Sequence, residues 1–355
     1  MTDAPTTRPL PWSDDVEQIQ PDEAEHIRRC IDSMHRTNAM TFDLHRHGVR
    51  ATHAKSHGIL RGTLTVHDDL PPELAQGLFA TGGARHDVVL RLATESGQLD
   101  DDRKPNARGL SLKVFDVAGE MLEPGTTTQD LLFNTLPILP PGTAQKFMEL
   151  AEIRERNFSD ENAMAAEVAA RPDGQTMTSF SRLVGNVHPL AHAYYTQGAF
   201  GYGDHVAKIA IYPDTAEQEA LAERTVGEDD DSSVLRALVE SWTTDRETVF
   251  DVRVQLRTSE SMPVEDASVD WDQSESPYRS VATVRLPPQQ PYSNARRVFA
   301  DDRLAFRPWH GLATHRPLGS VNRLRRAAYE ELGHQRTDLN AVEGTTMRSV
   351  DELPD

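Results

Sequence analysis

The chain of 355 residues contains a single cysteine, Cys30. One thiol excludes an intrachain disulfide framework and any zinc or iron–sulfur cluster held by several cysteines. It also indicates a reducing compartment. We therefore expect Cys30 to be a buried or half-buried helix residue rather than a reactive or metal-binding one.

Long hydrophobic runs are also missing. No window approaches 18 consecutive apolar residues, and the N-terminal stretch MTDAPTTRPLPWSDD lacks the apolar core of a secretory signal. The sequence predicts no transmembrane segment, and we expect a cytoplasmic protein.

Positive charge is scarce, and several common motifs are absent. The net charge is -19, and no run of Lys and Arg occurs of the length used for nucleic-acid binding. Such a surface repels phosphate backbones, so we expect no nucleic-acid partner. Neither a glycine-rich phosphate loop nor a G-x-S-x-G motif is present, which removes the usual signatures of nucleotide binding and of the commonest hydrolases.

What the chain does contain is a series of short strand-like segments. In FDVRVQLR (250–257), apolar residues alternate with polar ones, a period of two that is typical of a strand. Similar segments are separated by Gly, Asp and Pro, as in antiparallel sheets; they cover residues 59–66, 86–94, 109–116, 205–213 and 278–286. An open sheet of this size would expose its edges, so we predict an α+β fold with a closed antiparallel β-barrel and peripheral helices.

Helical patterns lie before, between and after these strands. An extended arm over residues 1–20 precedes a helix from about Asp22 to Met40, with an apolar stripe that includes Cys30. Further helices are predicted at 143–155, 160–170, 233–242 and 321–335, and the tail after Thr337 is predicted to be disordered. The expected organisation is an N-terminal arm and helix (1–40), a barrel (41–290), a crossing segment with the last helix (291–336), and a tail (337–355).

Four histidines crowd one region: His45, His47, His53 and His57. One interpretation is a non-haem metal site, because H-x-H on a strand places both imidazoles on one face. No Glu or third ligand follows at a recognised spacing. Taken alone, a histidine in such a polar, basic stretch as that around His53 is more often a solvated or structural residue than a catalytic one.

Tyr329 lies four residues after Arg325 on the predicted last helix, so both side chains share a face. A core tyrosine on an amphipathic helix is one interpretation. If the phenol lay close to an iron, an arginine within hydrogen-bonding reach would favour the phenolate and make it a strong axial ligand.

Six stretches resemble segments of the haem catalase family, in the family's order, from about residue 45 to 336. RATHAKSHG (50–58) resembles the segment around the distal histidine, and RRAAYEELGHQR (325–336) resembles the proximal R-x-F-x-Y-x-D-x-x-R-x-R element. The other four are VVLRLATESGQ (88–98), NARGLSLKVFD (106–116), QDLLFNTLP (129–137) and YYTQGAFGYGDHVAKIAIYP (194–213). The resemblance implies a β-barrel of catalase type that holds haem b (iron protoporphyrin IX) within the barrel.

The resemblance also implies a role for each matching residue. His53 would be the distal acid–base group and Asn134 the distal amide. Tyr329 would be the proximal iron ligand, with Arg325 as its charge partner. The arginines expected to pair with the haem propionates are Arg50, Arg91 and Arg336.

The departures from the family pattern matter as well. The chain ends soon after the proximal helix, so we expect the C-terminal helical region of full-length catalases to be missing and the haem to be more accessible. Ala93 stands where typical catalases have a serine that supports the distal histidine, and Glu331 and His334 replace an Asp and an Arg. Thr52 replaces a Val before His53, a pattern of the allene oxide synthase-like branch, in which that hydroxyl can hydrogen-bond the imidazole.

These features resemble the small catalase-related branch. The function they imply is a haem peroxidase that reduces organic hydroperoxides or hydrogen peroxide with a small-molecule electron donor and has weak catalase activity. Two alternatives stay open: an allene oxide synthase-like isomerase or lyase of fatty-acid hydroperoxides, and a non-catalytic haem-binding protein. Assembly into a homo-oligomer is left open.

Overall fold

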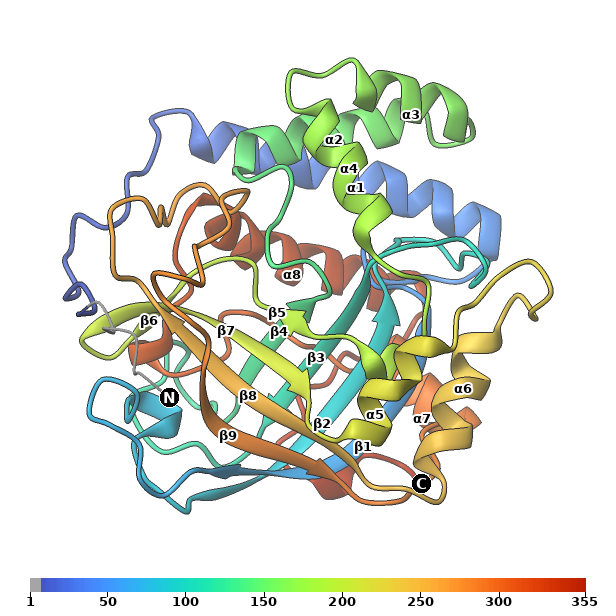
Figure 1. The fold of residues 1–355 in the computed structure, drawn as a ribbon. Coiled ribbons are helices and arrows are strands. Elements are labelled where there is room, and N and C mark those ends of the chain that lie inside the picture. Colours follow the sequence, from blue (N-terminus) through green and yellow to red (C-terminus); the bar gives the residue numbers. More distant parts are fainter. Residues whose placement is uncertain (1–7) are drawn as a thin grey trace.

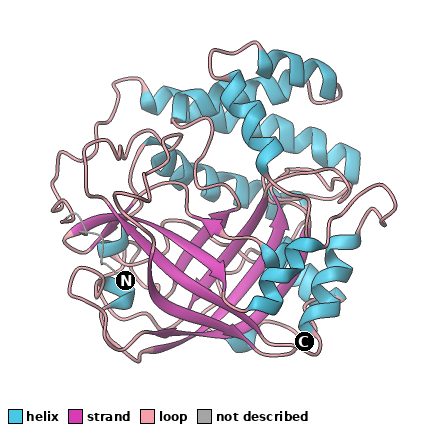
Figure 2. Ribbon diagram, in the orientation of Figure 1, coloured by secondary structure: helices cyan, strands magenta, loops and turns pink. Residues whose placement is uncertain are grey.

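The computed structural model describes residues 8–355, apart from the side chains of residues 179–183. The described chain is built on one antiparallel sheet (Figures 1 and 2). Its strands are β1 (Ser56–Val66), β2 (Arg85–Thr94), β3 (Arg108–Val114), β4 (Gln129–Asn134), β5 (Tyr194–Tyr195), β6 (Phe200–Tyr202), β7 (His205–Pro213), β8 (Thr248–Leu256) and β9 (Arg279–Leu286).

The sheet closes into a barrel. The strand order is β5-β4-β3-β2-β1-β9-β8-β7-β6, and a further pairing of β5 with β7 joins the two ends. β6 extends along the same edge of β7, where Phe200 pairs with Ala207. The predicted barrel is therefore confirmed, and closure leaves few sheet edges unpaired.

Apolar side chains fill the inside of the barrel. Along β2, the buried Leu90 and Leu92 belong to the main core cluster, and along β8 the inward residues include Phe250 and Val252. Because successive side chains of a strand point to opposite faces, Arg91 must point outward from the barrel wall. The interior is a packed core, so the expectation that haem lies within the barrel is wrong.

Helices form a layer above one end and side of the barrel. Figure 1 shows helices from the first half of the chain above the strands, and the last helix between them and the barrel. The α-helices of residues 8–355 are α1 (Glu23–His45), α2 (Ala144–Arg156), α3 (Glu161–Ala169), α4 (Gly174–Leu183), α5 (Ala216–Glu219), α6 (Val234–Thr243), α7 (Asn294–Arg297) and α8 (Ser320–Leu339).

Three of these helices share a second apolar cluster. Cys30 and Ile31 of α1 pack with Met148 of α2 and with Leu324 and Ala328 of α8. Burial raises the pKa of the Cys30 thiol to about 12, so this cysteine is the buried helix residue that the sequence predicts. The cluster fixes α8 against the helical layer.

The ends of α2 and α3 follow ordinary capping rules. The Thr143 side chain accepts a hydrogen bond from the Lys146 backbone N–H at the start of α2. Asp160 accepts from the backbone N–H groups of Asn162 and Ala163 at the start of α3. These caps account for the predicted helix starts near residues 143 and 160.

The C-terminal tail is ordered, so the prediction of disorder after Thr337 is wrong. α8 continues to Leu339, and the chain then returns along the barrel. Met347 and Leu353 are fully buried against the outward residues Ile59 and Val89 of β1 and β2. The segment after α8 shows no hydrophobic periodicity in its sequence, but burial of Met347 and Leu353 anchors it on the barrel.

Within residues 8–355, no helix is both long and apolar enough to cross a membrane.

Candidate active site

A cavity of about 490 Å³ lies between the outer wall of the barrel and the helical layer. The wall consists of outward residues of β2, β3 and β4, and the cover consists of residues of α1–α4 and α8. Six of the predicted site residues line this one cavity: Thr52, His53, Arg91, Asn134, Arg325 and Tyr329. The structure therefore brings together residues that are up to 277 positions apart in the chain.

His53 has an unusual backbone conformation. Its φ is +57°, in the left-handed region that non-glycine residues rarely adopt. Its backbone N–H donates to the carbonyl of Glu95 (2.8 Å), and its own carbonyl accepts from Arg91 Nη2 (3.0 Å). Strain of about 1–3 kcal/mol persists where neighbouring groups fix the geometry, as they do here.

The imidazole of His53 is half-buried and packs on Gly109. Its buried Nδ1 atom has no hydrogen-bond partner among the described residues. In the β2–β3 ladder Gly109 lies opposite Ala93, the residue that replaces the expected serine. Burial, helped by the nearby arginines and opposed by Glu95, lowers the pKa of His53 to about 4. The imidazole is therefore neutral near pH 7.

Thr52 lines the cavity, but its hydroxyl makes no hydrogen bond to the imidazole of His53 among the described residues. The expected Thr52–His53 hydrogen bond is therefore absent from this structure. The chain bends at these residues and His53 is left-handed, so sequence adjacency alone did not fix the contact.

Asn134 ends β4 and makes two side-chain hydrogen bonds. Its Oδ1 accepts from the backbone N–H of Leu136 (3.1 Å), and its Nδ2 donates to Glu95 Oε2 (2.8 Å). Glu95 lines the same cavity. Glu95 was not predicted as a site residue, because a single carboxylate after a strand carries no motif.

Tyr329 and Arg325 lie one helical turn apart on α8, as predicted. Arg325 Nη2 is 3.4 Å from the phenol oxygen, and the guanidinium carbon lies 5.3 Å from the centre of the ring. Arg325 is held in place by a hydrogen bond from Nη1 to Asn322 Oδ1 (3.0 Å). Both side chains line the cavity.

Arg50, Arg91 and Arg336 also come together, around Asp301. Arg91 Nη2 lies 3.0 Å and Arg50 Nη1 lies 3.4 Å from Asp301 Oδ1. Arg50 and Arg336 both donate to the carbonyl of Leu304. Of the three arginines, Arg91 alone lines the cavity.

This arginine cluster carries more positive than negative charge. Burial and the repulsion of Arg91 and Arg336 lower the pKa of Arg50, whereas the pKa of Asp301 is held below its ordinary value by Arg91 and Arg50 despite burial. Buried Arg336 Nε has no partner. Asp301 is the carboxylate that Arg50 and Arg91 contact, and nearby Asp302 contacts His47. Three guanidinium groups so arranged suit further anionic groups, so the cluster fits the propionates of a haem.

The histidine region does not form a metal site among the described residues. No three His, Cys, Asp or Glu side chains gather there or elsewhere in residues 8–355 in a way that could hold an ion. His45 ends α1, His47 contacts Asp302 (2.7 Å), and His57 in β1 contacts Thr94 (2.8 Å). His45 and His47 do not lie on a strand, so the geometric premise of that interpretation is wrong.

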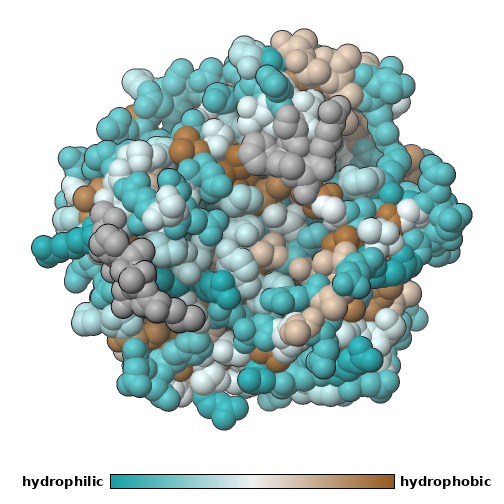
Figure 3. Space-filling view, viewed as in Figure 1, coloured by the Kyte–Doolittle hydropathy of each residue, from teal (hydrophilic) through white to brown (hydrophobic). Residues whose placement is uncertain are grey.

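The outer part of the cavity is mainly apolar. Its lining there includes Phe147 and Leu150 of α2, Met164 of α3 and Met177 of α4. Figure 3 shows a largely hydrophilic face with apolar side chains gathered beside these helices. Arg154 is the cation of this outer part, and it makes no hydrogen bond or ion pair with any described residue.

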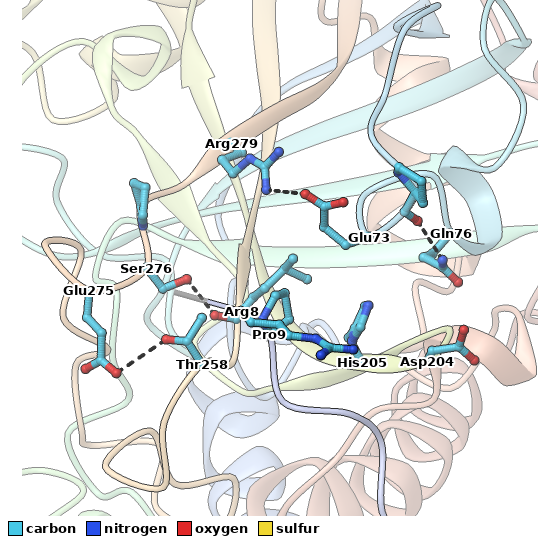
Figure 4. Close-up of a pocket in the computed structure, with 13 residues that line it drawn as sticks. Arg8, Pro9, Glu73, Gln76, Asp204, His205, Thr258, Glu275, Ser276 and Arg279 are labelled. Atoms are coloured by element: carbon cyan, nitrogen blue, oxygen red, sulfur yellow. Dashed lines mark hydrogen bonds and ion pairs between the residues drawn. The ribbon is translucent and has the colours of Figure 1, made fainter. Parts of the chain in front are cut away.

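A second cavity of about 450 Å³ lies at another end of the barrel, by the N-terminal arm (Figure 4). Its lining mixes both charge signs, and two of its charged residues, Arg279 and Glu73, form an ion pair at 2.8 Å. None of the predicted site residues lines it.

Comparisons with known proteins give a fold but no sequence family. No model of a protein family matches the chain, and no curated protein matches it significantly. Solved structures do match. A fungal catalase superposes with a TM-score of 0.63 at 17% identity, covering 86% of this chain and 65% of that chain. Catalase A from Saccharomyces cerevisiae gives 0.64 at 16% identity, covering 86% and 64%.

A bacterial catalase gives a TM-score of 0.59 at 15% identity and covers 84% of this chain and 59% of its own. The chain thus spans less than two thirds of the length of each of these three catalases. At such identities the likeness concerns the fold. The chain has the α+β fold of catalases, an antiparallel β-barrel with peripheral helices.

Proposed function

We propose that the protein is a haem-dependent peroxidase of the catalase-related kind, which reduces organic hydroperoxides or hydrogen peroxide with a small-molecule electron donor and has weak catalase activity. One observation carries the proposal. His53 and Tyr329 line the same cavity, and the Arg325 guanidinium lies 3.4 Å from the Tyr329 phenol oxygen. The cytoplasmic location and any homo-oligomer stay predictions from the sequence.

The residues of the cavity fit haem b. The Tyr329 phenol oxygen would be the iron ligand, and the positive charge of Arg325 favours its anionic form. Arg91, supported by Arg50 and Arg336, would hold the propionates. When bound, haem supplies the redox chemistry that breaks the O–O bond of a hydroperoxide.

The remaining steps belong to side chains of this protein. His53 is neutral near pH 7, because burial lowers its pKa to about 4, so it can exchange a proton with the hydroperoxide. Asn134 donates one N–H to Glu95, and its second amide N–H is free to orient a peroxide oxygen. Side chains from β2–β4 and α8 exclude bulk water from the inner part of the cavity.

The outer lining favours an organic hydroperoxide over hydrogen peroxide as the better substrate. Apolar residues of α2–α4 can bury a hydrocarbon chain. The unpaired guanidinium of Arg154 can bind a carboxylate carried by such a chain.

The same lining favours a second candidate function, an allene oxide synthase-like isomerase or lyase of fatty-acid hydroperoxides. The sequence pair Thr52–His53 resembles that branch. Such an enzyme would need no external reductant. Product analysis with a fatty-acid hydroperoxide in the absence of an electron donor therefore separates the two functions: rearranged products indicate the isomerase, and the corresponding alcohol with donor consumption indicates the peroxidase.

The test begins with an absorption spectrum of protein expressed with a haem supply. A Soret band with high-spin ferric features is expected. Stopped-flow mixing with hydrogen peroxide and with a fatty-acid hydroperoxide should then show consumption that His53→Ala lowers by roughly a hundredfold or more. A haem spectrum without such turnover would identify a non-catalytic haem-binding protein, and a protein that takes up no haem would refute the proposal.

A further inference from the structure

Glu95 holds a carboxylate at the inner end of the cavity. Its backbone is fixed on both sides: its N–H donates to the carbonyl of Ala107 (2.9 Å), and its carbonyl accepts from the backbone N–H of His53 (2.8 Å). Its side chain is partly buried and lines the cavity together with His53 and Asn134. The carboxylate therefore sits beside the group expected to move protons.

One oxygen of the Glu95 carboxylate is available to a substrate. Oε2 accepts the hydrogen bond from Asn134 Nδ2 (2.8 Å), whereas Oε1 makes no hydrogen bond among the described residues. Glu95 also forms no ion pair there. A partly buried carboxylate oxygen without a partner, facing a cavity, is a competent proton acceptor.

His53 is poorly arranged to be the sole base. A neutral imidazole has one N–H and one lone pair, and the hydrogen bond at one nitrogen decides which form the other takes. No described residue accepts a hydrogen bond from His53 Nδ1, and the neighbouring Ala93 and Gly109 carry no side-chain oxygen that could do so. The tautomer with a lone pair on Nε2, which a base needs, is therefore not stabilised, and leaving an N–H at Nδ1 buried without a partner costs about 1–3 kcal/mol.

The charges around Glu95 and His53 support a joint role of these two residues in proton transfer. The pKa of His53 is raised by Glu95 and lowered by Arg91, Arg325 and Arg50, besides the larger effect of burial. The charge of Glu95 therefore acts on the imidazole against that of the arginines, so the two side chains are electrostatically coupled.

The geometry points to Glu95 as a second catalytic acid–base residue of this site. Glu95 accepts the proton of the bound hydroperoxide, while His53 donates a hydrogen bond to the hydroperoxide. This inference rests on the proposed haem function. In the step, the O–H bond of the hydroperoxide breaks and an O–H bond forms on Glu95. As the O–O bond breaks, the departing oxygen takes the bonding electron pair together with the proton from Glu95 and leaves as an alcohol or water. The two electrons consumed come from the haem and are restored by the electron donor.

Cyanide binding tests this role without turnover. Hydrogen cyanide must lose its proton to bind ferric haem, so its association rate, followed by the shift of the Soret band, reports a proton acceptor in the cavity. Glu95→Gln should keep the hydrogen bond from Asn134 and lower the cyanide association rate near pH 7 by roughly tenfold or more. Glu95→Asp should keep most of the wild-type rate. Nitric oxide, which carries no proton, should bind both variants at the wild-type rate.

A matched control is Glu73→Gln, which removes a half-buried carboxylate that lines the other cavity; its cyanide rate should equal that of the wild type. Wild-type cyanide association in Glu95→Gln, together with a loss in His53→Ala, would overturn the role of Glu95 and leave the proposed function standing. Failure of the wild-type protein to show a haem spectrum would overturn both.

Discussion

The imidazole of His53 fits its place because residue 109 is a glycine. A Cβ atom built at Gly109 would stand 2.2 Å from His53 Nδ1 and 2.4 Å from His53 Cε1, far inside van der Waals contact. The two residues come from different elements, the loop before β1 and the start of β3. The site therefore depends on the absence of one side chain in the barrel wall.

Gly109→Ala should displace the imidazole. Hydroperoxide consumption should fall at least about tenfold, since misplacing a catalytic group by 1 Å can cost a hundredfold. The free energy of unfolding should decrease by about 1–3 kcal/mol from overpacking. Stopped-flow kinetics and urea denaturation measure the two effects. Gly227→Ala is the matched control, because a Cβ there meets nothing within 4 Å. Wild-type turnover in Gly109→Ala would show that the position of His53 does not matter.

Tyr329→Phe should lose or weakly retain haem, because it removes the oxygen proposed as the iron ligand. The measurement is the ratio of Soret to protein absorbance after gel filtration. Tyr212→Phe removes a half-buried phenol outside the cavity and should retain the wild-type ratio. Full haem retention with an unchanged spectrum in Tyr329→Phe would refute the axial assignment.

Much of the fold could be predicted because periodicity reports which face a strand or helix buries. The alternation in 250–257 places Phe250 and Val252 in the core, as found in β8. The stripe through Cys30 marks the buried side of α1, although that helix ends at His45 rather than near Met40. β4, β5, β6, α4, α5 and α7 were missed. β5 and β6 are two and three residues long, too short for any period to show.

The position of the site relative to the barrel was harder to predict. Arg91 lies between two inward leucines, so alternation alone would have placed it outside the wall. Most residues around it in β2 are apolar, because both faces of this strand are buried. A continuous apolar run hides the alternation. Glu95 and Arg154 could not be predicted as site residues, since only the packing of distant helices on β2–β4 shows that they face the cavity.

Asp301→Asn should destabilise the protein. Two arginines contact this carboxylate directly, and a third, Arg336, lies in the same buried cluster. Removing one partner of a buried ion pair typically costs 3–5 kcal/mol; since Asp301 is 22% exposed, a loss of about 3 kcal/mol is expected. Urea denaturation near pH 7 measures it.

The pH dependence of that difference follows from the depressed pKa of Asp301. A carboxyl group whose pKa is lower in the folded than in the unfolded state stabilises the folded state at any pH above its unfolded-state pKa. This contribution is lost as the pH falls through the folded-state pKa. The gap between wild type and Asp301→Asn should therefore persist above about pH 4 and narrow below it. A gap that widens on acidification would contradict the ion-pair assignment.

Buried histidines should make the fold sensitive to mild acid. Burial lowers the pKa of His53, His188, His192 and His315 to about 4. Between about pH 6.5 and pH 4 the unfolded chain binds protons that the folded chain does not, so the free energy of unfolding should fall with pH by up to about 1.4 kcal/mol per unit for each histidine. Urea denaturation across this range should show the slope, and His188→Gln should reduce it. A flat profile would mean that these imidazoles titrate normally.

Arg154→Gln should change substrate preference rather than chemistry. Its side chain is exposed and makes no hydrogen bond or ion pair with a described residue, and α2 carries none of the proposed proton-transfer groups. If it binds the carboxylate of an amphipathic hydroperoxide, the variant should raise the KM for that substrate by roughly tenfold, the value of one partly exposed charge-assisted hydrogen bond of about 1.5 kcal/mol. The kcat for the same substrate, and both constants for its neutral methyl ester, should stay near the wild-type values.

Arg156→Gln is the matched control on the same helix, because Arg156 is paired with Glu167 and does not line the cavity. Equal changes in KM for the acid and the ester would show that Arg154 does not bind the carboxylate of the substrate. The apolar lining alone would then select the substrate.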